Sequence, residues 1–216
     1  MTTARPNLVF IMADDHAAHA ISAYDASLTR TPSLDRLASE GMRFDNCFCT
    51  NSICTPSRAA VLTGTYNHVN RVTTLDTPMD ARMPTFASLL QDAGYRTAII
   101  GKWHLGHGGI HDPRGFDHWA VLPDQGEYND PTMLHDDGSQ RVHRGYVTDI
   151  LTDQTLEWIG HQPDDQPFAV LLHHKAPHRP WDHDDELRDT VDSAALPEPV
   201  SLFDDHSGRP PPPVKP

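Results

Sequence analysis

The chain has 216 residues, a length that suits one α/β domain or two small ones, with 30 Asp and Glu residues against 17 Lys and Arg residues. Its formal net charge of −13 repels polyanions, so nucleic acid is not expected as a partner. No apolar run approaches the roughly 20 residues that span a bilayer, and acids follow the first apolar run where a signal peptide would be cleaved, so we expect no membrane segment and a cytoplasmic location.

Apolar runs and helix signals alternate in the first part of the chain. Residues 7–12 (NLVFIM) form a short apolar run that is typical of a strand covered on both faces. Residues 31–41 predict a helix, because a Thr-Pro pair opens the segment and a glycine closes it. A second helix is expected at 55–64, which places Cys54 immediately before its first turn.

The same alternation continues in the second part. We expect a helix at 83–94 and a strand at 97–100, then a connection rich in Gly, Pro and Asp at 106–140. A helix at 146–159 and a strand at 168–172 follow. Alternating helices and apolar strands predict an α/β fold with a mostly parallel sheet and helices on both faces.

Ionisable residues follow each of the three predicted strands. Ligands of such sheets bind outside the carboxyl ends of the strands, so we expect these side chains to converge on one rim. They are Asp14 and Asp15, Lys102 and His104, and Lys175 and His178. Because the chain has 15 histidines, other histidines are expected to have ordinary structural roles. These are His16, His19, His107, His111, His173 and His174.

The three cysteines, Cys47, Cys49 and Cys54, lie in one short stretch. An odd count without a secretion signal argues against a disulfide framework. Their C-x-C-x4-C spacing matches no common structural zinc site, so a zinc module is the least favoured alternative.

Two motifs together carry a family resemblance. Residues 54–58 read CTPSR, which has the form C-x-P-x-R, and residues 94–106 read GYRTAIIGKWHLG. In order and separation they resemble the two signatures of the type I sulfatases, and the acidic pair and the APHRP segment extend the resemblance over residues 6–208. The resemblance implies an alkaline-phosphatase-like fold, here truncated, and hydrolysis of sulfate esters.

The resemblance also implies a modified nucleophile. A separate maturation enzyme would oxidise Cys54 to formylglycine, whose hydrated aldehyde attacks sulfur with one hydroxyl and expels sulfate with the other. Arg58 would hold the hydrate, His104 would match the base near it, and His178 would match the acid beside the leaving group.

Charge considerations fit this reaction, because negative charge must be stabilised around the sulfate. Asp14 and Asp15 offer hard oxygens to Ca²⁺ or Mg²⁺, and with the modified Cys54 they form the expected metal-binding set. Lys102 and Lys175, together with the Arg58 guanidinium, supply fixed positive charge. The expected substrate is a small-molecule or carbohydrate sulfate ester.

The chain departs from the family in its last part. Sulfatases have a second acidic and amide or histidine pair for the metal and another lysine, whereas after Lys175 only Lys215 follows. We therefore expect residues 1–208 to be the N-terminal part of a catalytic domain and residues 209–216 to be a disordered or frameshifted proline-rich tail. Two alternatives stay open: a phosphonate or phosphodiester hydrolase of the same superfamily, and a catalytically inactive remnant.

Overall fold

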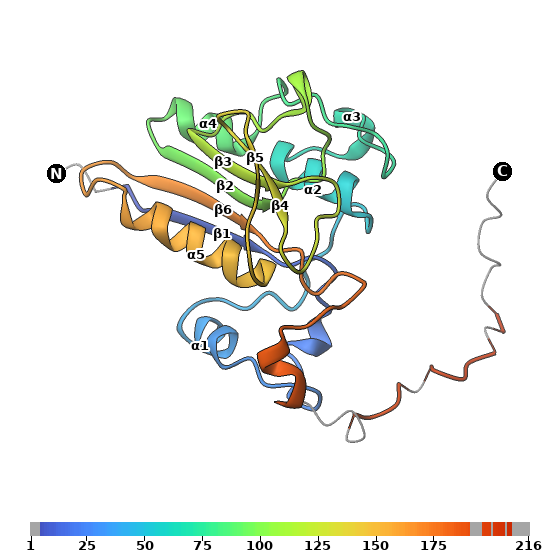
Figure 1. Cartoon of the computed structure of the whole chain (residues 1–216). Helices are drawn as coiled ribbons and strands as arrows, with labels where there is room; N and C mark the ends of the chain where they lie inside the picture. The colour runs from blue at the N-terminus through green and yellow to red at the C-terminus, as the bar shows by residue number, and fades with distance from the viewer. Residues whose placement is uncertain (1–4, 191–195, 200, 206, 209–216) are drawn as a thin grey trace. The chain divides into compact units, whose positions relative to one another are not determined.

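The computed structural model describes residues 5–190, 196–199, 201–205 and 207–208 (Figure 1). Its main feature is a six-stranded sheet with the order β1-β6-β2-β3-β4-β5. The β1/β6, β6/β2 and β2/β3 pairs are parallel, and the last two pairs are antiparallel, which confirms a mostly parallel sheet. The strands are β1 (Leu8–Met12), β2 (Arg96–Lys102), β3 (His118–Leu122), β4 (Thr132–His135), β5 (Gln140–Val142) and β6 (Phe168–His173).

Helices cover both faces of the sheet (Figure 1). Successive side chains of a strand point to opposite faces, so Ile99 of β2 packs with Leu62 of α2, while its neighbour Ile100 packs with Leu151 of α5. Phe86 of α4 packs against the same cluster as Ile99. The helices are α1 (Pro32–Glu40), α2 (Cys54–Thr63), α3 (Asn67–Asn70), α4 (Phe86–Asp92) and α5 (Val147–Gly160), with short 3-10 turns η1 (Ala18–Ala20), η2 (Gly109–His111) and η3 (Asp185–Thr190).

The chain divides into two compact units. The larger unit runs up to His16 and from Phe44 to Asp184, and it holds the whole sheet. The smaller unit holds residues 17–43, including α1, and described residues that follow Asp184. The predicted tail at 209–216 lies outside the described residues. Within the described residues, no helix is long and apolar enough to cross a bilayer.

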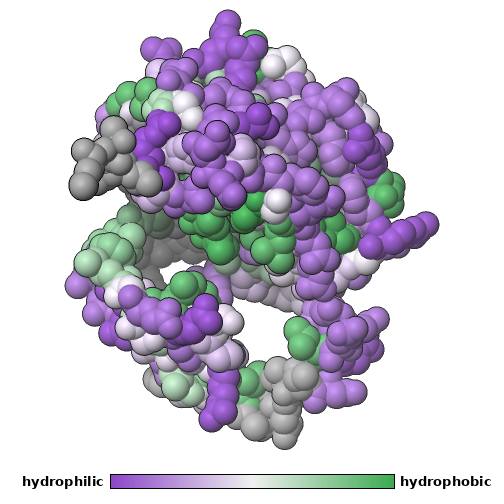
Figure 2. Space-filling model, turned by 90° about the vertical axis from the view of Figure 1, so that its left-hand side faces the viewer, coloured by the Kyte–Doolittle hydropathy of each residue, from purple (hydrophilic) through white to green (hydrophobic). Residues whose placement is uncertain are grey.

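β1 is the outermost strand of the described sheet, and the prediction that it is covered on both faces is wrong. Its side chains on both faces are partly exposed: 53% for Val9 and 59% for Ile11 on one face, 36% for Phe10 on the other. Within the described sheet only β6 pairs with it, so β1 has a neighbouring strand on one side only. Figure 2 shows apolar side chains gathered in a band on one face of the molecule.

β2 and β6 approach each other closely where both strands end. Gly101 has a φ of +112°, and a Cβ built on it would lie 2.0 Å from the carbonyl oxygen of His173. Only glycine is free of this contact, so Gly101 allows the chain to place Lys102 directly beside the end of β6.

Candidate active site

The predicted site residues come from the carboxyl ends of three neighbouring strands and from the start of α2. Asp14 and Asp15 follow β1, Lys102 ends β2, and Lys175 follows β6. Because β6 lies between β1 and β2, these strand ends meet at one edge of the sheet. Cys54 is the first residue of α2, with Ile53 as N-cap, so the helix begins one residue earlier than predicted.

Asp14 is a buried carboxylate between two cations. It is 6% exposed, its Oδ2 accepts a hydrogen bond from Lys102 Nζ, and the same oxygen lies 3.4 Å from Arg58 Nη2. Burial alone would raise the pKa of Asp14, but Arg58 and Lys102 outweigh burial, so its pKa is lowered. Asp14 therefore stays ionised and keeps both cations in place.

Arg58 is as deeply buried as Asp14, with 3% of its surface exposed. Its Nη1 donates a hydrogen bond of 2.6 Å to the carbonyl oxygen of Lys102 and lies 3.3 Å from Nδ1 of His173. One turn of α2 separates Arg58 from Cys54, so both side chains belong to the same end of the helix.

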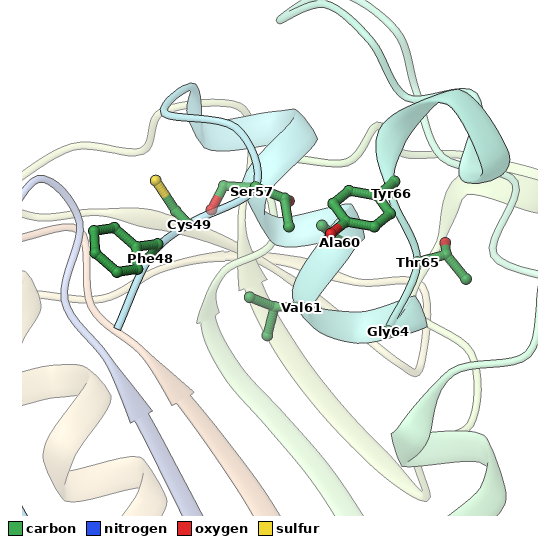
Figure 3. Close-up of a pocket in the computed structure, with 9 residues that line it drawn as sticks. Phe48, Cys49, Ser57, Ala60, Val61, Gly64, Thr65 and Tyr66 are labelled. Atoms are coloured by element: carbon green, nitrogen blue, oxygen red, sulfur yellow. The ribbon is translucent and has the colours of Figure 1, made fainter. Parts of the chain in front are cut away.

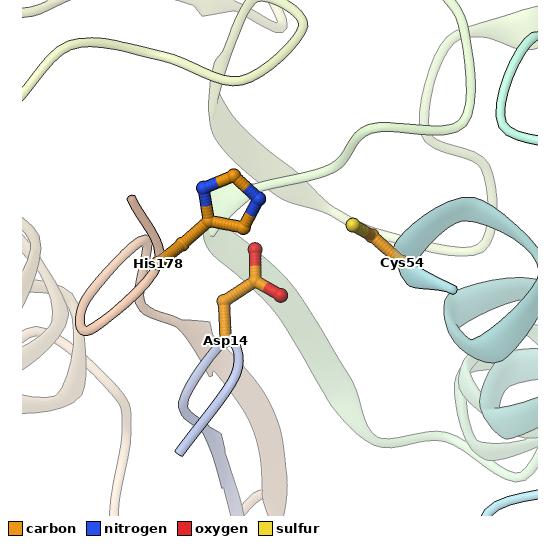
Figure 4. A group of neighbouring side chains, drawn as sticks. All are labelled: Asp14, Cys54 and His178. Carbon is orange, nitrogen blue, oxygen red and sulfur yellow. The ribbon is translucent and has the colours of Figure 1, made fainter. Parts of the chain in front are cut away.

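Cys54 lies opposite Asp14 and His178 (Figure 4). One ligand atom from each of the three side chains lies within 4.8 Å of the others. Asp15 is at the rim: 60% of its side chain is exposed, and its Oδ2 is 3.7 Å from Nε2 of His178. The backbone of Asp15 has a φ of 63°, a left-handed conformation that is uncommon outside glycine.

The donor set decides which metal suits this group. Asp14 and Asp15 provide the oxygens that Ca²⁺ and Mg²⁺ prefer, so the two carboxylates fit a hard divalent cation. The thiol of Cys54 does not, because sulfur prefers softer metals. Cys54 fits the expected metal-binding set only if an oxygen replaces its sulfur, as formylglycine would provide.

His104 lies beside α2 with a backbone φ of 53°. Its Nδ1 is 3.5 Å from Thr55 Oγ1, and its Nε2 is 3.3 Å from Nε2 of Gln125. Burial, followed by the charges of Lys102 and Arg58, lowers the pKa of His104 to about 4. At neutral pH the imidazole is therefore uncharged and able to accept a proton.

Lys175 is fixed by two residues that sequence patterns did not indicate. Its Nζ donates to the carbonyl oxygen of Gln125 at 3.1 Å and lies 4.8 Å from the ring centre of Tyr128. The Tyr128 hydroxyl also donates to the carbonyl oxygen of His178. Gln125 and Tyr128 lie in the connection at 106–140, which has no motif that would single them out.

Two cavities flank α2, and they differ in chemistry. One, of about 660 Å³, contains four of the predicted site residues: Asp15, Cys54, Lys175 and His178. The other, of about 380 Å³, has no charged side chain in its lining (Figure 3). Its lining residues are Phe48, Cys49, Thr50, Ser57, Ala60, Val61, Gly64, Thr65 and Tyr66. Only the first cavity combines a thiol with acids, bases and cations.

Comparison with known proteins agrees with this arrangement. A family model described as Sulfatase matches residues 6–198. An N-acetylglucosamine-6-O-sulfatase of Bacteroides thetaiotaomicron is 44% identical over 210 residues, which cover 96% of this chain and 37% of that protein. A solved structure in complex with its substrate D-glucosamine-2-N,6-O-disulfate has a TM-score of 0.88 and 44% identity, over 95% of this chain and 41% of that chain.

A phosphonate monoester hydrolase of Agrobacterium radiobacter shares the fold, with a TM-score of 0.69 and 23% identity over 90% of this chain and 45% of that chain. The chain belongs to the sulfatase family, as its two motifs predicted. It spans less than half the length of the sulfatase relatives described above.

Proposed function

We propose that this chain is the active-site part of a hydrolase that acts on carbohydrate sulfate esters, with 6-O-sulfated glucosamine as the first candidate substrate. The observation that carries the proposal is the position of Cys54 at the first turn of α2, facing Asp14 and His178. The 44% identity to an N-acetylglucosamine-6-O-sulfatase supports the choice of sugar.

Cys54 is proposed to be converted to formylglycine by a maturation enzyme. One hydroxyl of the hydrated aldehyde would attack sulfur, which breaks the ester S–O bond and releases the sugar hydroxyl. The second hydroxyl would then lose its proton and re-form the aldehyde, which breaks the C–O bond to sulfate and releases it. Asp14 and Asp15 would hold a Ca²⁺ or Mg²⁺ ion, which when bound would supply positive charge beside the sulfate.

Cations around the cavity balance the charge of the sulfate. Lys175 lines the cavity directly, and Lys102 with Arg58 keeps the Asp14 carboxylate ionised beneath it. We assign His104, neutral at pH 7 and 3.5 Å from Thr55, as the base near the hydrated aldehyde, and His178, 7% exposed, as the acid that protonates the leaving oxygen.

The test measures modification and turnover together. The full chain is produced with and without a formylglycine-generating enzyme, the Cys54 peptide is analysed by mass spectrometry, and sulfate release is measured from glucosamine 6-sulfate. Cys54→Ala should abolish release, whereas Cys49→Ala, at a cysteine outside the cavity of Cys54, should leave it unchanged.

Two results contradict the proposal. One is an unmodified thiol at position 54 together with no sulfate release, as expected for an inactive remnant. The other is faster turnover of a phosphonate ester than of any sulfate ester under the same conditions, which would favour the phosphonate hydrolase alternative.

A further inference from the structure

His173 is a buried histidine for which the sequence predicts an ordinary structural role. Its ring lies against Arg58, one of the predicted site residues. His173 is the last residue of β6, is 1% exposed, and pairs in the sheet with Met12 of β1 and Gly101 of β2. Its ring lies edge-on to Phe10, with centroids 5.9 Å apart. Within the described residues, its Nε2 has no hydrogen-bond partner.

We propose that His173 is a positioning residue for Arg58: its neutral imidazole accepts a hydrogen bond at Nδ1 from the Arg58 guanidinium and fixes the plane of that group beside Asp14. The supporting geometry is a distance of 3.3 Å between Arg58 Nη1 and His173 Nδ1. The catalytic consequence rests on the proposed sulfatase function, whereas the hydrogen bond itself does not.

Hydrogen counting favours this arrangement over the other tautomer. Nη1 of Arg58 carries two hydrogens and no lone pair, and one hydrogen goes to the Lys102 carbonyl oxygen at 2.6 Å. Nδ1 of His173 is 3.3 Å from the same oxygen, whose two lone pairs could accept from both groups, so that oxygen does not decide between the tautomers. The contact with Nη1 does decide, because Nη1 can only donate: a proton on Nδ1 would make two N–H groups face each other at 3.3 Å, whereas a lone pair on Nδ1 accepts the second Nη1 hydrogen. The ring proton then lies on Nε2, which has no partner among the described residues.

Electrostatics point the same way. A hydrogen bond from a buried guanidinium to the lone pair of Nδ1 is charge-assisted, whereas an N–H group directed at the guanidinium is repelled by its positive charge. Burial, followed by the Arg58 charge, holds the pKa of His173 well below its usual value, so the ring stays neutral.

The contact matters because Arg58 is otherwise incompletely held. Its Nε has no hydrogen-bond partner among the described residues, and Nη2 lies 3.4 Å from Asp14. With Nη1 bound to two acceptors, the guanidinium cannot rotate about its Nε–Cζ bond without breaking both bonds. His173 therefore adds a third contact to those that Lys102 and Asp14 make with the guanidinium, and it fixes the plane of the group more tightly.

The first test reads the tautomer directly. Long-range ¹H–¹⁵N correlation spectra of the unmodified full chain should show His173 as the neutral tautomer protonated at Nε2. A neutral ring protonated at Nδ1, or a charged ring at pH 7, would overturn the proposal. This measurement needs neither formylglycine nor activity.

The second test uses two side chains of nearly the same shape. His173→Asn keeps an acceptor where Nδ1 lies, and His173→Leu removes it. The slowly rotating Nη resonances of Arg58, assigned by their loss in Arg58→Lys, should persist in the Asn variant and average out in the Leu variant. Identical Arg58 spectra in the two variants contradict the proposal.

Controls separate positioning from packing. Leu172→Ala, at a buried neighbour on the same strand, should lower thermal stability and leave the Arg58 resonances unchanged. If the Leu variant does not fold, His173→Gln replaces it, because its oxygen lies farther along the side chain and should not restore the Nδ1 contact.

Kinetics give the third test. In chains matured to formylglycine, His173→Leu should lower kcat by at least about tenfold with little change in KM, and His173→Asn should recover most of kcat. An unchanged kcat in the Leu variant contradicts the proposal. If the parent chain itself releases no sulfate, the sulfatase function fails, and the two spectroscopic tests still decide the role of His173.

Discussion

Single residues of the site show how burial selects protonation states. His104 is uncharged at neutral pH because burial, with Lys102 and Arg58 nearby, lowers its pKa to about 4. In the unfolded chain the same ring titrates near its ordinary value of about 6.5. Between these two values the unfolded chain binds a proton that the folded chain does not.

A pH dependence of stability follows from this difference. The contribution of the neutral His104 ring to the free energy of unfolding is fully present above about pH 6.5. It is lost as the pH falls towards 4, because the unfolded chain then binds a proton more readily than the folded chain. The melting temperature should therefore drop across this range, and His104→Gln should make the drop shallower. Thermal unfolding at half-unit pH steps measures it; equal slopes for the two proteins would contradict the assigned shift.

At the strand ends, the spacing between β2 and β6 determines where the site residues lie. At Gly101 an added methyl group would lie 2.0 Å from a carbonyl oxygen of β6, whereas Gly138, which also has a positive φ, has open space around it. Gly138→Ala should cost about 1 kcal/mol from its backbone conformation alone. Gly101→Ala should cost at least about 2 kcal/mol more, since the strands must separate.

Urea denaturation of both variants measures this difference. Similar losses would mean that the close approach of β2 and β6 is not needed. Gly101→Ala should also reduce any sulfate release, because Lys102 is the next residue along the chain.

The elements that sequence patterns predicted are those with strong local signals. The strands at β1, β2 and β6 are continuous apolar runs, and α5 has helical periodicity. β3 and β4 were missed because they lie at 106–140, where Gly, Pro and Asp indicate loops, and β5, a strand of three residues, begins where that connection ends. β3 reads HWAVL, an apolar run that could have been recognised.

The site was predicted less completely than the fold. The ionisable residues after the predicted strands and the two motifs together predicted eight site residues, and the structure brings these to one edge of the sheet. Their catalytic roles remain predictions. Contacts made through space were not predictable: nothing local distinguishes His173 from the adjacent His174, yet only His173 meets Arg58. Gln125 was missed for the same reason.

The whole molecule presents an apolar edge at β1. Val9 and Ile11 are more than half exposed on a strand that has a neighbour on one side only in the described sheet. Such an edge favours pairing with other chains. We expect concentration-dependent self-association, which Ile11→Lys should reduce.

Sedimentation velocity over a range of concentrations measures this association. Leu156→Lys is the matched control, because Leu156 is 61% exposed but lies on α5 and not on the sheet edge. An equal effect of the two substitutions would show that general hydrophobicity, and not the strand edge, drives the association.

The order of strands in the sheet also determines how long β1 remains without its neighbour during synthesis. β1 is translated first, but its neighbour β6 is translated last of the six strands, and Asn7 and Phe168, which share a hydrogen bond, are 161 residues apart. At ordinary rates of translation the ribosome needs roughly ten to thirty seconds to cover that interval. During this time the apolar strand β1 lacks β6, its neighbour in the described sheet, so slower elongation or higher temperature should lower the yield of folded protein.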